Sequence, residues 1–353
     1  MKEKPSADSL STLSVRDSNM ELLRIASMLM VVLFHVDLLG MAYDQPQWSS
    51  LSAASLSGYA LLKSLTMSCV NIFVLISGLY GLRLTLGKFL SLVFQVVFFS
   101  LAIYLWFVFS DAEVAFSLSY FFRLAIGSGY WFVPSYLLLF LFSPILNLFV
   151  EHIPKRQFAV VLVSLFGFMF VYSWLVKDVW FDKGCSPLFF FLLYLLGRYL
   201  KLYPCRLSAK NAWYYLAVFV LTAVVVALLS VLFFKNGYDE VGWRLFQNNS
   251  PFNILCSLSM LLFFSKIPLK NRLINRFGIS CFSLYLFHAH PVFFDKVFYR
   301  YVHFWFVTTS GLSLFFRIVL FVIVLSVVSF LFDAFFRTLR QGAMRCLRPT
   351  NVR

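Results

Sequence analysis

Two side chains near the N-terminus, Arg24 and His35, have the types and the spacing for proton transfer beside an anionic ligand. They lie eleven positions apart in an apolar stretch, and at about 100° per residue eleven steps bring both onto one helix face. The rise between them is about 16–17 Å, about half of the hydrocarbon core of a membrane. Because an ionisable residue inside a membrane span is costly, the pair marks a candidate functional site.

Each member of this pair has two explanations. A neutral imidazole accepts a proton near physiological pH, so His35 is either a general base or a buried histidine bonded to a neighbouring helix. The guanidinium of Arg24 suits phosphate oxygens, but an arginine at a membrane boundary also extends to the headgroups and fixes the topology. Glu21, one turn earlier, can pair with Arg24. Asp37 projects from a different face and is expected at the outer boundary.

Five further residues are candidates for ligand contacts. Arg83 and Lys88 follow the second apolar stretch, where loop charge that sets orientation is the simpler explanation and phosphate binding is the alternative. Tyr130 and Trp131 open the fourth stretch, either as an aromatic belt or as a platform that stacks on a sugar ring or an acyl carrier. His288 is expected near mid-membrane, as a polar group of a cavity or as a cap for carbonyls freed by the following proline.

The composition predicts an all-α, polytopic integral membrane protein. Hydrophobic residues make up 61% of the 353 residues and charged residues 13%, with repeated apolar stretches of about 20 residues. The period-two alternation of a membrane barrel is absent. The net charge of +15 lies mostly in short loops, so it indicates membrane orientation rather than a nucleic-acid partner.

We predict about ten transmembrane helices. Residues 1–19 form a disordered cytoplasmic tail, 20–337 the ten-helix membrane domain, and 338–353 a basic cytoplasmic tail. A short interfacial helix is expected within 111–129. The spans are expected at about 20–40, 58–82, 88–110, 130–150, 157–177, 186–203, 211–234, 250–268, 278–299 and 312–336.

The lysines and arginines set the orientation. With the N-terminus in the cytoplasm, about two thirds of the 30 basic residues fall in inner segments, as the positive-inside rule requires. Both termini are therefore predicted to be cytoplasmic. Adding or removing one span would scramble this alternation, so the span count and the orientation support each other.

Several classes of site are absent from the sequence. The six cysteines show no CxxC or zinc-like spacing, so we expect neither a metal site nor a disulfide framework. No serine-centred elbow, paired catalytic carboxylates or P-loop is visible. The absence of a P-loop argues against a pump with its own nucleotide site.

In several motifs the chain resembles the membrane-bound acyltransferase-3 family, whose members O-acetylate sugars. The resemblance runs through nearly the whole chain, and the order of the motifs makes the set fairly specific. The matching segments are Glu21-Leu22-Leu23-Arg24 with His35, Asn71 to Gly78, Tyr130-Trp131-Phe132 with Pro144 and Asn147, Leu196-Gly197-Arg198-Tyr199, and Ser283 to His288.

The resemblance implies a ten-helix core that takes an acetyl group from cytoplasmic acetyl-CoA. The acceptor would be a hydroxyl of an extracytoplasmic or lipid-linked glycan, and the location a bacterial inner membrane. It implies that His35 is the catalytic residue, with Arg24 essential beside it and on the CoA side. In some relatives basic residues after the second span help to bind CoA, and here only Arg83 and Lys88 are available, at a looser spacing. For the acceptor we single out Tyr130, Trp131 and His288. A homo-oligomer is compatible with the sequence.

Two other classes of function stay open on the residues alone. A glycan or lipid transporter or flippase fits ten spans, midplane polar residues and proline breaks, although repeat symmetry is absent and intramembrane carboxylates are few. A membrane scaffold would tolerate both Arg24→Ala and His35→Ala. Transfer of labelled acetyl groups separates the enzyme from both, because a transporter leaves the mass of its substrate unchanged.

Overall fold

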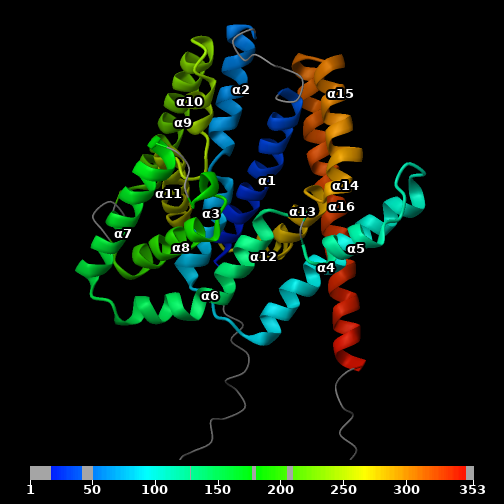
Figure 1. Cartoon of the computed structure of the whole chain (residues 1–353), viewed down its shortest axis with the longest axis horizontal. Helices are drawn as coiled ribbons and strands as arrows, with labels where there is room; N and C mark the ends of the chain where they lie inside the picture. Colours follow the sequence, from blue (N-terminus) through cyan, green and yellow to red (C-terminus); the bar gives the residue numbers. More distant parts are fainter. Residues whose placement is uncertain (1–16, 42–50, 128, 177–179, 205–209, 347–353) are drawn as a thin grey trace, which may run out of the picture.

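The computed structural model describes residues 17–41, 51–127, 129–176, 180–204 and 210–346, and this part of the chain is helical without strands (Figure 1). Its α-helices are α1 (Ser18–Met41), α2 (Ala53–Thr66), α3 (Cys69–Tyr80), α4 (Leu86–Ser110), α5 (Leu118–Ala125), α6 (Phe132–His152), α7 (Lys155–Met169), α8 (Pro187–Leu202), α9 (Ala212–Lys235), α10 (Asp239–Arg244), α11 (Pro251–Ser265), α12 (Arg272–Ile279), α13 (Cys281–His288), α14 (Pro291–Phe293), α15 (Arg300–Thr308) and α16 (Gly311–Cys346). Shorter turns are the π-helical η3 (Phe170–Val176) and η6 (Phe294–Tyr299) and the 3-10 turn η4 (Asp182–Gly184).

Seven helical segments of the described chain are long and apolar enough to cross a membrane, which confirms an all-α polytopic membrane protein. They coincide with seven of the predicted spans and are Ser18–Asp37, Ala53–Tyr80, Leu86–Ser110, Phe132–His152, Lys155–Val176, Ala212–Lys235 and Gly311–Gln341. The spans predicted at 186–203 and 250–268 correspond to the shorter helices α8 and α11. The count of ten stays a prediction. The short helix expected within 111–129 is α5.

The ninth predicted span is not one straight helix. In its place the segments Arg272–His288 and Pro291–Thr308 meet at an angle of 67°. Proline has no N–H for the helix before it, and it restricts the residue before it to extended backbone. His290 accordingly has φ −61° and ψ 127°, and its side chain accepts the N–H of Phe293 as the new helix begins. The break therefore follows from Pro291, and it falls inside the span predicted at 278–299.

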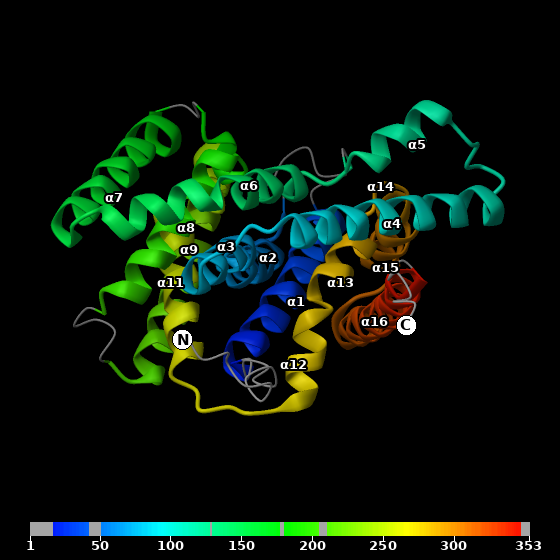
Figure 2. The same ribbon diagram turned by 90° about the horizontal axis from the view of Figure 1, so that it is seen from below.

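Helix α1 lies in the interior of the bundle (Figure 2). It packs against α2, α3, α11, α12, α13 and α15, which come from widely separated parts of the chain. A residue on any face of α1 therefore contacts protein, and the Arg24–His35 face points into the molecule rather than into lipid.

Helices α3 and α8 approach each other closely at two glycines. A Cβ on Gly78 would lie 3.0 Å from the Cα of Gly197, and a Cβ on Gly197 would lie 2.6 Å from the carbonyl oxygen of Leu75. Small residues allow such backbone contact between membrane helices, where van der Waals packing drives association. Both glycines belong to motifs that carry the family resemblance.

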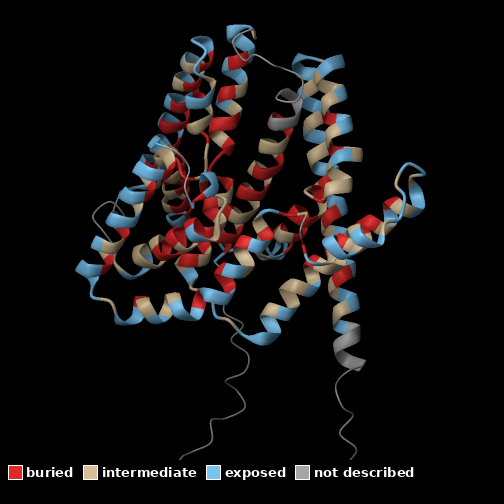
Figure 3. Cartoon of the chain, viewed as in Figure 1, coloured by how far each residue is buried: buried red, intermediate tan, exposed pale blue. Residues whose placement is uncertain are grey.

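Exposed apolar side chains cover the outside of the long helices, whereas buried residues gather inside the bundle (Figure 3). On α16, Phe315, Phe316, Leu320 and Leu331 are all more than half exposed. Such a surface suits a hydrocarbon environment. The interior divides into two apolar clusters, one around Leu75 and Phe189 and one around Val32 and Phe298.

Candidate active site

A cavity of about 780 Å³ lies between α1, α3, α4, α6 and α12–α13, and its lining also includes Lys183, Cys185 and residues 246–248. Its wall includes residues of both apolar clusters, such as Met67 of one and Val31 of the other. The cavity therefore occupies the junction of the two clusters. Arg24 and His35 both line it, as their shared helix face predicts.

His35 is held by a second histidine. Its Nδ1 lies 3.0 Å from Nε2 of His288, and Nδ1 of His288 lies 2.7 Å from the carbonyl oxygen of Leu284. A carbonyl only accepts, so Nδ1 of His288 carries a proton, and in the neutral ring Nε2 is then an acceptor. His35 must donate from Nδ1 to this acceptor, which leaves the lone pair of neutral His35 on Nε2.

This Nε2 atom of His35 is the one that could accept a proton in the neutral ring. It has no hydrogen-bond partner among the described residues, and its ring lines the cavity. Phe294 packs edge-on against the ring at a centroid distance of 5.4 Å, which restricts its rotation. The histidine pair thus presents an oriented lone pair to whatever enters the cavity.

Arg24 lies at the other end of the cavity. It pairs with the buried Glu21, and its guanidinium lies 5.8 Å from the ring centroid of Tyr80. Its side chain keeps 28% exposure, so the charge is accessible although Glu21 holds it. A guanidinium in this state can fix one partner and still meet an anionic group of a ligand.

The two basic residues after α3, Arg83 and Lys88, differ in their position relative to the cavity. Lys88 lines the cavity, as Arg24 does. Its backbone N–H donates to the hydroxyl of Thr85 at 3.3 Å, and this hydroxyl caps the start of α4. Arg83 is exposed and is not among the residues that line the cavity. The geometry therefore groups Lys88, rather than Arg83, with Arg24. A contact of either one with CoA stays a prediction.

The three residues singled out for the acceptor also differ in position. Trp131 lines the cavity and is 44% exposed. Tyr130 is buried behind the wall, where its hydroxyl donates to the carbonyl oxygen of Leu286 at 2.8 Å. His288 is fully buried and reaches the cavity only through His35. Direct contact with a substrate thus fits Trp131, and the other two support the wall.

A buried ion pair lies next to the site and was not expected from the sequence. Asp37 ends the first membrane-long segment, and it is buried against protein there, with Lys63 Nζ 3.4 Å from its carboxylate. The ammonium of Lys63 also lies 4.6 Å from the ring centroid of Phe34 and 4.7 Å from that of Trp243. The pair depends on the packing of α2 against α1, which hydropathy alone could not reveal.

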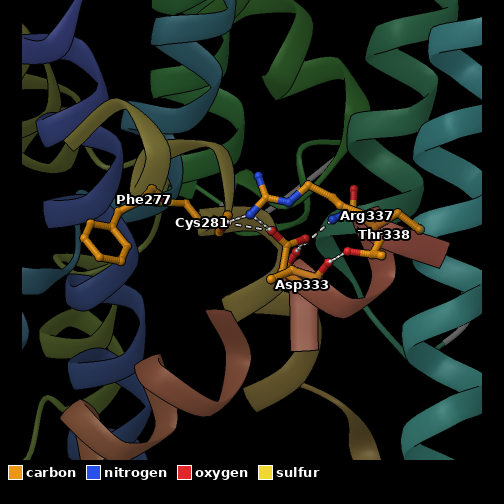
Figure 4. A network of polar contacts seen from close by, with 9 residues as sticks. Phe277, Cys281, Asp333, Arg337 and Thr338 are labelled. Carbon is orange, nitrogen blue, oxygen red and sulfur yellow. Dashed lines mark hydrogen bonds and ion pairs between the residues drawn. The ribbon is translucent and has the colours of Figure 1, made fainter. Parts of the chain in front are cut away.

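A second polar network joins the cavity wall to the last helix. Gln95, which lines the cavity, donates to Ser283, and the hydroxyls of Ser283 and Ser280 donate to the carboxylate of Asp333 at 2.5 and 2.7 Å. Figure 4 shows the guanidinium of Arg337 facing this carboxylate, at 2.9 Å. The network fixes α13, which carries His288, against α4 and α16.

The architecture and the cavity define a multi-pass helical membrane protein with a pair of histidines at an internal cavity. A family model for an acyltransferase domain matches residues 17–332, and the chain therefore belongs to the acyltransferase-3 family of membrane acyltransferases. Comparison with curated proteins and with solved structures finds no match. Within the described residues, no group of three or more His, Cys, Asp or Glu side chains is placed to hold a metal ion.

Proposed function

We propose that this acyltransferase moves an acetyl group from cytoplasmic acetyl-CoA to a hydroxyl of an extracytoplasmic or lipid-linked glycan, in a bacterial inner membrane. One observation carries the proposal: His35 and the pair Arg24 and Lys88 line the same cavity, and Nε2 of His35 makes no hydrogen bond with any described residue. A base and an anion site are the two elements that transfer from a phosphate-bearing thioester requires.

In the proposed reaction, Nε2 of His35 removes the proton of the acceptor hydroxyl while the oxygen attacks the thioester carbonyl carbon. The carbon–sulfur bond then breaks, and the proton passes from His35 to the departing thiolate. The products are the O-acetyl ester and the free thiol of CoA, so no proton is gained or lost. His288 accepts from Nδ1 of His35 throughout and holds the ring in place as its charge changes.

Arg24 and Lys88 would bind the phosphates of CoA at the end of the cavity away from His35. This leaves the thioester arm to extend along the mainly apolar wall towards the imidazole. Trp131 would contact the acceptor, because its partly exposed ring lies on the same cavity.

The test is transfer of radiolabelled acetyl groups from acetyl-CoA into total glycan, in membranes that carry the wild-type chain or His35→Ala at equal abundance. Loss of the base should lower transfer on the order of 10²- to 10⁴-fold. His152→Ala is the matched control, because His152 is exposed and its ring bonds only its own helix.

Near-normal transfer by His35→Ala would contradict the assigned role of the histidine. A wild-type chain that adds no label, while folded and supplied with glycan, would contradict acetyl transfer itself and favour transport.

A further inference from the structure

The charge of the cavity extends beyond what the donor requires. Among the described residues that line it, the permanently charged side chains are Arg24, Lys88 and Lys183, and neither Asp nor Glu is present. The proposed function uses Arg24 and Lys88 for CoA and leaves Lys183 without a role.

Lys183 lies at the opposite end of the cavity from Arg24. Arg24 stacks near Tyr80, at the C-terminal end of α3, whereas Asn71 near the start of α3 donates to the carbonyl oxygen of Asn248 at 2.8 Å. Tyr80 lies nine helical steps after Asn71, about 13–14 Å along the axis. The backbone N–H of Asn248 in turn donates to the carbonyl oxygen of Lys183 at 3.0 Å. Lys183 therefore lies near the start of α3, at the end of that helix far from Arg24.

The backbone around Lys183 is strained and locked in place. The φ angles are 45° at Asp182, 53° at Lys183 and 87° at Gly184. All three lie in the left-handed region, which residues other than glycine rarely adopt. A Cβ on Gly184 would lie 2.5 Å from the backbone nitrogen of Asn249, so this turn packs directly on the 247–250 segment. Strained backbone of this kind persists only where the surroundings fix it, and it gathers at binding sites.

Two further groups at this end suit a sugar. Gln247 lines the cavity, and its side-chain amide makes no hydrogen bond with any described residue. Trp131 offers a partly exposed aromatic face to the same space. An amide for hydroxyl groups, an aromatic face for the ring and an ammonium for an acid together match an acidic sugar better than a neutral one.

We propose that the acceptor glycan carries an anionic group, a carboxylate or a phosphate, that binds Lys183 while the hydroxyl to be acetylated lies at His35. The inference rests on the proposed function and specifies its acceptor. The phosphates of the donor would be held by the positive charges of Arg24 and Lys88 at one end of the cavity. A salt bridge to the positive charge of Lys183 at the other end would orient the sugar relative to the donor.

The experiment follows the labelled product. Membranes with the wild-type chain receive radiolabelled acetyl-CoA, mild acid releases the glycan from any lipid pyrophosphate, and anion exchange separates acidic from neutral glycan. Most of the label should be retained as acidic glycan. Amidation of carboxylates with a carbodiimide then identifies the acid, since carboxylate-bearing label loses its retention and label on a phosphodiester keeps it.

Two variants connect the product to Lys183. Lys183→Met should lower label in the acidic fraction about tenfold or more, as loss of a charged hydrogen bond does, with CoA binding in equilibrium dialysis unchanged. Lys183→Arg should restore much of it. Lys201→Met is the matched control, because Lys201 is exposed and does not line the cavity.

Label that elutes as neutral glycan, or acidic label that Lys183→Met leaves intact, would overturn the acidic acceptor while acetyl transfer stands. A wild-type chain that gives no label at all would instead overturn the proposed function.

Discussion

Nδ1 of His35 lies 3.0 Å from Nε2 of His288, although the two histidines are 253 positions apart in the chain. The contact joins the first helix to the segment before the 67° bend, and the carbonyl of Leu284 completes it. A base held in one tautomer loses no time or free energy in reorienting before it accepts a proton. We therefore treat His288 as a positioning residue for His35.

We expect His288→Phe to lower the rate of acetyl transfer on the order of 10²-fold or more, because His35 loses the acceptor that sets its tautomer. His288→Gln should retain much of the activity, since the amide oxygen can accept from Nδ1 of His35. The measurement is the transfer rate at saturating acetyl-CoA and equal folded abundance. A packing role alone would reverse the order, with phenylalanine tolerated better than glutamine.

Lys88 and Arg83 should differ in their effect on the donor. Lys88→Met is expected to raise the KM for acetyl-CoA about tenfold, since Lys88 lines the cavity with Arg24. Arg83→Met should change it about twofold or less, because Arg83 is exposed away from the wall. Initial rates over a range of acetyl-CoA concentrations check this. Equal effects of the two variants would mean that CoA extends beyond the cavity mouth.

The Asp37–Lys63 pair should matter for stability. Removing one partner leaves an uncompensated charge in the interior, so Lys63→Met should destabilise the fold by about 3–5 kcal/mol. The double variant Lys63→Met with Asp37→Leu should recover most of the loss. Thermal unfolding in detergent micelles measures both. As a control, Glu240→Gln breaks the exposed pair with Arg244 and should cost about 1 kcal/mol or less.

Gly197→Ala should loosen the contact between α3 and α8. The added methyl group would meet the backbone of Leu75, which cannot rotate away, so the helices must separate at a cost of about 1–3 kcal/mol. The matched control is Gly167→Ala, where a Cβ meets nothing within 4 Å. Midpoints of thermal unfolding compare the two. A Gly197→Ala midpoint no lower than that of Gly167→Ala would contradict close backbone packing here.

The sequence predicted those parts of the structure that depend on periodicity. Hydropathy located the long spans, and the 3.6-residue period placed Arg24 and His35 on one face, because both are local properties of a helix. The sequence pattern could not place α13 against α1, so it indicated His288 as a candidate without indicating its contact with His35. It also listed Tyr130 and Trp131 together, whereas neighbours at the start of a helix project in different directions and only Trp131 lines the cavity.

Contacts between distant segments account for the rest. Asp37 and Lys63 each look like boundary charges, and only the packing of α2 on α1 makes them a buried pair. Lys183, Gln247 and Asn248 lie in loops with no periodic pattern, and the cavity brings them together. A left-handed turn at residues 182–184 has no sequence signal beyond Gly184.

The carboxylate of Asp333 has a consequence for the order in which the protein is assembled. Ser280 and Ser283 are made about fifty residues before Asp333, so during synthesis they enter the membrane ahead of the acceptor that their hydroxyls bond. Until α16 is inserted, α13 lacks these hydrogen bonds to Asp333. His288, which is part of α13 and orients His35, is therefore not yet held in place. Competence for chemistry should therefore be reached only after α16 has been made and has docked, and a nascent chain that already spans the membrane without α16 would still be inactive.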